Sequence, residues 1–187
     1  SKPFDIIVSN PPYSTKWEGS DNAILISDER FSIAGALAPK SKSDLAFVMH
    51  ILNYLSPNGT AAIVEFPGVL YRSGAEATIR KYLVGKNYID CVIQLPENLF
   101  FGVSIATCII VIKKNKKDTK TLFINASNFF IKSTNKNKLS NENIERILEL
   151  YKKRENIENI CALIDNSDIL ANEANLSVSS YVEAKDT

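Results

Sequence analysis

The fold of this chain is decided by one stretch of sequence, Phe4-Asp5-Ile6-Ile7-Val8-Ser9-Asn10-Pro11-Pro12-Tyr13, in which an apolar run stops at a polar corner. Residues 6–8 are β-branched and uncharged, which predicts a buried strand covered on both faces. The two prolines fix successive φ angles and supply no backbone N–H, so neither a helix nor a sheet ladder continues through them. We therefore expect a strand that ends in a rigid tip with several hydrogen-bond acceptors.

Such a tip suits the alkylation of an amino group on a planar ring. The ring withdraws the lone pair of this nitrogen, so the amine is a poor nucleophile until both N–H bonds are drawn into position. The Oδ atom of Asn10 and the carbonyl of Pro11 are two acceptors that would turn the lone pair towards an electrophile. The ring of Tyr13 offers a flat surface for stacking. Positioning and charge stabilisation then lower the barrier without a strong base.

An Asn-Pro-Pro-Tyr tip after an apolar strand resembles the catalytic signature of amino-group methyltransferases that use S-adenosylmethionine (AdoMet), including N6-adenine DNA methyltransferases. More of the chain, from about residue 3 to about residue 183, resembles the modification subunit of type I restriction-modification enzymes. The segments that carry this resemblance are Arg30-Phe31, Leu37-Ala38-Pro39-Lys40-Ser41-Lys42-Ser43-Asp44, Asn58-Gly59-Thr60-Ala61-Ala62-Ile63-Val64, Ile79-Arg80-Lys81-Tyr82-Leu83, Leu95-Pro96-Glu97-Asn98-Leu99-Phe100 and Ser104-Ile105-Ala106-Thr107-Cys108-Ile109.

The resemblance implies methylation of adenine N6 in duplex DNA, with AdoMet as cofactor and the adenine flipped out of the helix. It implies that the four residues Asn10, Pro11, Pro12 and Tyr13 form the catalytic tip and that Asn10 also contacts the cofactor. It also implies that Tyr13 and Phe100 sandwich the base. Phe101 competes with Phe100 for this role, and a phenylalanine that serves only as a core or hinge residue is the structural alternative.

The passage between Tyr13 and the next helix, Ser14–Ser43, has no regular pattern. It is either a flap over the active-site mouth or a mobile surface loop with a few anchoring aromatics. As a flap, it would bring Lys40 and Lys42 to DNA phosphates and place Trp17 or Phe31 over the base.

Beyond the tip, helical and strand patterns alternate, as a parallel α/β sheet requires. Strands are expected at 60–65, 88–94 and 121–125, with a helix after Ser43, a second helix opened by a Ser73/Glu76 capping box, and a third capped by Ser140. The linker before the apolar 105–112 segment is too short for a helical crossover, so that strand is expected to be antiparallel. The tip and the segments 65–68 and 94–98 should meet at the carboxyl ends of their strands.

The predicted fold class is therefore α/β, and the resemblance makes it the carboxyl-terminal part of a Rossmann-like AdoMet-dependent methyltransferase sheet with a terminal antiparallel strand. We expect a partial catalytic domain over 1–135 and a helical or irregular tail over 136–187 that packs on it. The seven glycines are scattered without Gly-x-Gly spacing, so the AdoMet-binding half of the domain is expected to be missing and the chain to be a fragment.

The composition of the chain limits the ways in which it could bind nucleic acid or other partners. The net charge of +1 gives no overall attraction to nucleic acid, so DNA contacts must come from local patches or a partner subunit. The resemblance implies a DNA-specificity subunit and a restriction subunit in a type I complex. We expect a cytoplasmic protein with no membrane span and no metal. The three cysteines are interpreted as buried reduced thiols, and His50 as structural or solvent-facing.

Two alternatives to DNA methylation remain. A glutamine amide in a protein is also a conjugated planar amine, so a protein methyltransferase would use the same tip. In the second alternative, the isolated polypeptide is only a scaffold or folding unit that binds no cofactor. This is what we expect of residues 1–187 alone.

Overall fold

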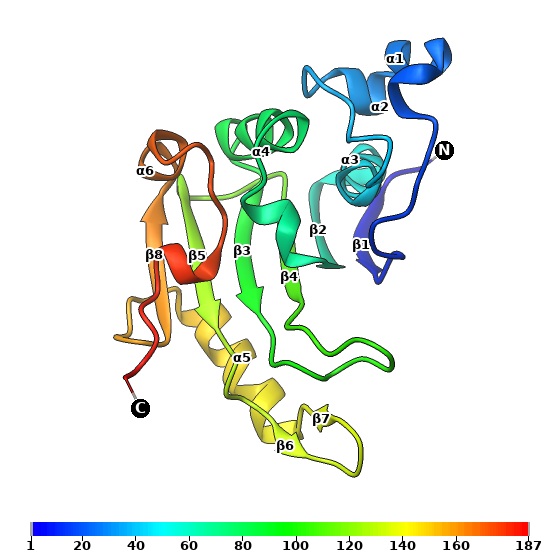
Figure 1. Cartoon of the computed structure of the whole chain (residues 1–187). Coiled ribbons are helices and arrows are strands. Elements are labelled where there is room, and N and C mark those ends of the chain that lie inside the picture. Colours follow the sequence, from blue (N-terminus) through cyan, green and yellow to red (C-terminus); the bar gives the residue numbers. More distant parts are fainter. Residues whose placement is uncertain (1, 187) are drawn as a thin grey trace.

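The alternation of strands and helices produces one central sheet in the computed structural model, which describes residues 2–186 (Figure 1). The sheet has the strand order β1-β2-β4-β3-β5-β8. Pairing is parallel between β1 and β2 and between β3 and β5, whereas β4 and β8 run antiparallel to their neighbours. The strands are β1 Phe4–Ser9, β2 Leu55–Glu65, β3 Ile89–Gln94, β4 Cys108–Lys113, β5 Lys120–Asn125 and β8 Cys161–Asp165.

The α-helices are α1 Ala23–Ser27, α2 Glu29–Ser32, α3 Asp44–Tyr54, α4 Ala75–Gly85, α5 Asn141–Lys153 and α6 Asn166–Ala171. Short 3₁₀ turns lie at Gly19–Asp21, Pro67–Leu70 and Val178–Ser180, and a small hairpin pairs β6 Ile131–Lys132 with β7 Asn137–Lys138. The predicted α/β class and the antiparallel strand are confirmed, because β4 lies between β2 and β3 and runs against both.

Alternate residues of the central strands pack into two separate cores. Val92 and Phe123 join the core under α3 and α4, whereas Cys91, Ile93 and Leu122 join the core under α5. This alternation is what a strand buried on both faces produces. It places α3 and α4 on one face of the sheet and α5 on the other.

The strand that precedes the tip is less covered than its sequence suggests. Ile6 is 76% exposed and Val8 is 77% exposed, because β1 is an edge strand and α5 does not extend over it. Its other face is half-buried, and Ile7 packs against the core under α3. The expectation of a strand covered on both faces is therefore wrong for the described chain.

Two local expectations are also wrong. The α4 helix is not opened by a capping box, because Gly74 occupies its N-cap with φ 76 and Glu76 instead pairs with Arg72 at 2.6 Å. The irregular 14–43 passage contains the two short helices α1 and α2, with Asn22 and Asp28 as side-chain N-caps. The expected cap of the third helix is confirmed, since Ser140 forms a capping box at the start of α5.

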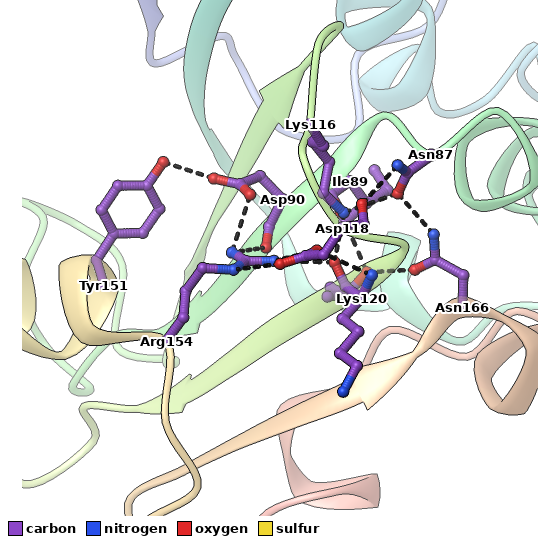
Figure 2. A network of polar contacts seen from close by, with 10 residues as sticks. Asn87, Ile89, Asp90, Lys116, Asp118, Lys120, Tyr151, Arg154 and Asn166 are labelled. Carbon is purple, nitrogen blue, oxygen red and sulfur yellow. Dashed lines mark hydrogen bonds and ion pairs between the residues drawn. The ribbon is translucent and has the colours of Figure 1, made fainter.

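The carboxyl-terminal end of α5 is fixed to the sheet by a polar network (Figure 2). Arg154, in a left-handed conformation with φ 48, pairs with Asp90 at 2.9 Å and with Asp118 at 3.1 Å. Tyr151 donates its hydroxyl to Asp90 at 2.5 Å. The Lys116 ammonium donates to three acceptors, Asn87 Oδ1, the Ile89 carbonyl and the Lys120 carbonyl.

This network lies at the end of the sheet where β3 and β5 begin. The tip of β1 lies at the opposite end (Figure 1). Within the expected 136–187 tail, β8 forms an edge strand of this same sheet.

Candidate active site

The site is built around the tip that follows β1. Asn10 and Pro12 are exposed, Pro11 is buried and Tyr13 is half-buried. Among the described residues the Asn10 side chain makes no hydrogen bond, so its amide is free to bind a ligand. The two prolines end the ladder here, as expected from their missing N–H groups.

The N-terminal turn of α3 holds the segment that leaves the tip. The Ser14 N–H donates to Asp44 Oδ1 at 3.0 Å, and the Ser43 N–H donates to the Thr15 carbonyl at 2.9 Å. Ser14 has φ 50, a strained conformation for a residue with a side chain. Asp44 is fully buried and fixes this conformation. Sequence reasoning missed Asp44, which follows the expected cap Ser43 and gives no sign of a partner 30 residues away.

Five buried polar atoms have no hydrogen-bond partner among the described residues. They are Ser43 Oγ, Asp44 Oδ2, Thr107 Oγ1 and both carboxyl oxygens of Glu65. Their residues are at the start of α3, at the end of β2 and immediately before β4. Buried polar atoms are nearly always paired, so a group of unpaired ones in one region marks a candidate functional site.

The pKa values of Glu65 and Tyr13 are both raised, and Glu65 contributes to the shift of Tyr13. Burial, and to a lesser extent Asp44, raises the pKa of Glu65 to about 9, so this carboxyl is neutral at pH 7. Burial, followed by Glu65 and Cys108, also raises the pKa of the Tyr13 phenol. The tip, the end of β2 and the start of β4 are thus close enough to interact, and strong pKa perturbation is typical of functional sites.

The 14–43 passage packs on α3 and not over the tip. Phe31 is buried in the core, its ring meets Trp17 edge-on at 5.3 Å, and the Trp17 indole donates to the Pro39 carbonyl at 3.0 Å. These aromatics anchor the passage, so the structure gives no support to either ring covering a base. A cavity of about 390 Å³ lies beside them, lined in part by Ser43 and Phe47.

The two phenylalanines after β3 differ sharply in exposure. Phe100 is half-buried, packs against the core under α5 and forms an isolated bridge with Val103. Phe101 is 97% exposed on a loop that turns at Gly102, where φ is 73. Within residues 2–186, none of the aromatic ring pairs joins Tyr13 to Phe100 or Phe101, so the stacking role stays a prediction.

The remaining residues that the sequence singled out are Lys40, Lys42 and His50. Lys40 pairs with Asp21 at 2.8 Å on the surface, and Lys42 is half-buried in the turn before α3. His50 lies 2.8 Å from an Arg30 nitrogen, and burial, followed by Arg30, lowers its pKa.

Within residues 2–186 no group of three or more His, Cys, Asp or Glu residues has a metal-binding arrangement. In the same range, every helix is too short or too polar to cross a bilayer.

One protein-family model matches the chain along its whole length. The family model described as N-6 DNA Methylase matches residues 1–187. The chain belongs to the N-6 DNA methylase family.

Two relatives of this N-6 DNA methylase chain are named as methylase subunits. It is 49% identical over 183 residues to the type I restriction enzyme MpnII methylase subunit of Mycoplasma pneumoniae, a match that covers 97% of this chain and 34% of that protein. It is 37% identical over 186 residues to the MjaVIII methylase subunit of Methanocaldococcus jannaschii, covering 95% of this chain and 32% of that protein. The chain spans about a third of the length of these relatives.

Solved structures of methylase subunits have the same fold. The type I methyltransferase subunit from Streptococcus thermophilus superimposes with a TM-score of 0.93 at 45% identity, covering 97% of this N-6 DNA methylase chain and 39% of that chain. The EcoKI M protein superimposes with a TM-score of 0.71 at 17% identity, which shows the fold alone. The sheet of this chain is therefore part of a Rossmann-like methyltransferase fold.

Proposed function

We propose that this chain is the carboxyl-terminal catalytic portion of a type I modification subunit that methylates adenine N6 in duplex DNA. The free amide of Asn10 at an exposed, proline-stiffened tip carries this proposal. Family membership and the similarity to named methylase subunits support it. Sequence choice is assigned to a specificity subunit, and cleavage to a restriction subunit of the same complex.

In this proposal the tip activates the amine by holding it. Asn10 Oδ and the Pro11 carbonyl accept the two N–H bonds of a flipped adenine, and Tyr13 stacks on its ring. This orientation frees the nitrogen lone pair for attack. As the new N–C bond forms, the S–C bond of the methyl donor would break to leave a neutral thioether, and one amine proton would leave to solvent. Asp44 holds Ser14 in its strained conformation and so keeps the tip in this shape.

The methyl donor in this proposal is AdoMet, which supplies an electrophilic methyl group on a sulfonium when it is bound. Asn10 fits one side of such a ligand because its amide is exposed and unpaired among the described residues. The cavity beside Ser43 and Phe47 offers an apolar wall and an unpaired hydroxyl. The remainder of the pocket is assigned to sequence that the longer relatives have and these 187 residues do not span.

The test uses the full-length subunit in complex with its partners. We expect Asn10→Ala to fold normally and to lose transfer of labelled methyl groups to DNA. Asn53→Ala, at an exposed position near the end of α3, is the matched control and should keep wild-type transfer. Wild-type turnover by Asn10→Ala would overturn the assignment, as would label that enters protein and not DNA.

A second measurement assigns the stacking residue. A duplex with 2-aminopurine at the target position becomes fluorescent when the base leaves the stack. Phe100→Ala is expected to leave the flipped base more mobile and to raise the KM for DNA, whereas Phe101→Ala should leave the environment of the base unchanged. The reverse pattern would transfer the role to Phe101.

A further inference from the structure

The β6–β7 hairpin is locally positive although the chain is nearly neutral. Residues 131–138, which we call the basic hairpin, contain Lys132, Lys136 and Lys138 and no acidic residue. The whole chain has 22 lysines and arginines against 21 acidic residues, so the positive charge of this segment is local. All three lysines are exposed, and none forms an ion pair within residues 2–186. Lysines without acidic partners attract phosphate groups.

The basic hairpin is held at the same end of the sheet as the tip. The Asn137 N–H donates to the Asn98 carbonyl at 2.8 Å, and the Asn137 side chain donates to the Glu97 carbonyl at 2.9 Å. Both acceptors belong to the loop that follows β3. Figure 1 shows this loop and the hairpin beyond the end of the sheet towards which β1, β3 and β5 point. The three lysines are therefore anchored to the loop that carries Phe100 and Phe101.

An exposed aromatic side chain lies on that same loop. Phe101 is 97% exposed, and the Gly102 turn beside it has φ 73. Proteins that distort DNA insert exposed apolar side chains of this kind between bases. Cations and a flat apolar ring on adjoining segments are the combination found on nucleic-acid-binding surfaces.

Three lysines in the other basic segments, Lys40, Lys114 and Lys116, are already engaged. Lys40 pairs with Asp21 at 2.8 Å. Lys114 donates to the Leu55 carbonyl at 2.7 Å, and Lys116 donates to three acceptors in the network of Figure 2. The turn that carries the last two lies at the end of the sheet opposite the tip. The basic hairpin is thus better placed to contact a substrate that reaches the tip.

We propose that the basic hairpin binds the phosphate backbone of duplex DNA next to the target adenine. This inference rests on the proposed function and names the element that holds the duplex. It requires no contact with base edges, because phosphate contacts position a duplex without reading its sequence.

The test compares two triple variants of the full-length subunit in its complex. Lys132→Gln, Lys136→Gln and Lys138→Gln are combined in the hairpin variant. The control combines Lys81→Gln, Lys86→Gln and Lys117→Gln, which removes the same charge from exposed positions away from the tip. Fluorescence anisotropy gives the Kd for a labelled duplex containing the target site between 50 and 200 mM salt.

Each lost phosphate contact lowers the slope of log K against log salt by about 0.9. Between 50 and 200 mM salt, the fold-loss of affinity should therefore be about 40 times smaller in a variant that lacks three contacts than in wild type. We expect the hairpin variant to show this reduced salt dependence, with a higher KM for DNA and an unchanged kcat at saturating DNA. The control should keep the wild-type slope.

A hairpin variant with the wild-type slope would overturn the inference, and so would equal losses in both triple variants. The proposed function is judged separately by methyl transfer in the wild-type complex. A wild-type complex that methylates DNA, together with an unaffected hairpin variant, would reject the hairpin and keep the function. A wild-type complex that transfers no methyl group to DNA would reject the function itself.

Discussion

Replacing Glu65 with glutamine is expected to change the pH dependence of stability. Both carboxyl oxygens of Glu65 are buried without partners among the described residues, and burial, followed by the influence of Asp44, raises its pKa from 4.5 to about 9. Unfolding exposes this carboxyl to water and restores its ordinary pKa. At pH values between these two pKa values, the folded chain holds one proton more than the unfolded chain. The free energy of unfolding therefore falls as the pH rises.

The size of this effect follows from the proton difference. One proton changes the free energy of unfolding by about 1.4 kcal/mol per pH unit, so Glu65 accounts for a loss of about 3 kcal/mol between pH 5.5 and pH 8. Glutamine keeps the shape of the side chain and does not titrate. The stability of Glu65→Gln relative to wild type should therefore rise by about this amount over the same range.

Urea denaturation at several pH values measures this difference, with the fluorescence of the single tryptophan, Trp17, as the probe. Other titrating groups cancel when the variant is compared with wild type. Glu158→Gln removes a carboxyl from an exposed position and should shift stability by less than about 0.5 kcal/mol at every pH. Parallel stability curves for wild type and Glu65→Gln would refute the view that Glu65 is neutral in the folded chain.

Two further predictions concern the residues that fix the ends of the sheet. Arg154→Ala should cost about 3 to 5 kcal/mol in urea denaturation, because it leaves the buried Asp90 carboxylate without its cation. Asp118→Asn, at a carboxyl that is 40% exposed, should cost less than about 1 kcal/mol, and equal losses would argue against this difference. Asp44→Ala should cost about 1 to 3 kcal/mol and abolish the hydrogen-exchange protection of the Ser14 amide, which Asp44→Asn should retain.

Much of the fold was predictable because it depends on local patterns. The length of the linker before β4 excluded a helical crossover and correctly indicated an antiparallel strand. Ser140 opens α5 as expected, because a serine cap needs only its own helix turn. The same reasoning failed at Glu76, where an ion pair with Arg72 and a glycine N-cap replaced the expected capping box.

The parts of the site that escaped prediction depend on long-range contacts. The tip itself was predictable, since Pro11 and Pro12 determine where the strand stops. The partner of Ser14 was not, because Asp44 is 30 residues away and its spacing carries no signal. The exposure of Val8 was not predictable either, because a β-branched run does not reveal whether its strand lies at the edge of the sheet.

The two ends of the sheet satisfy their polar groups in opposite ways, and this contrast argues for function at the tip. Where β3 and β5 begin, the side chains of Arg154 and Lys116 are hydrogen-bonded to several acceptors, including the carboxylates of Asp90 and Asp118. At the other end, Glu65 and Asp44 have buried oxygens without a hydrogen-bond partner within residues 2–186. Unpaired buried oxygens lower stability and form no contact that would offset this cost, so packing alone gives no reason to retain them. Their presence beside an exposed tip and the strained Ser14 is explained if that end of the sheet binds and orients a substrate, as proposed for the target adenine.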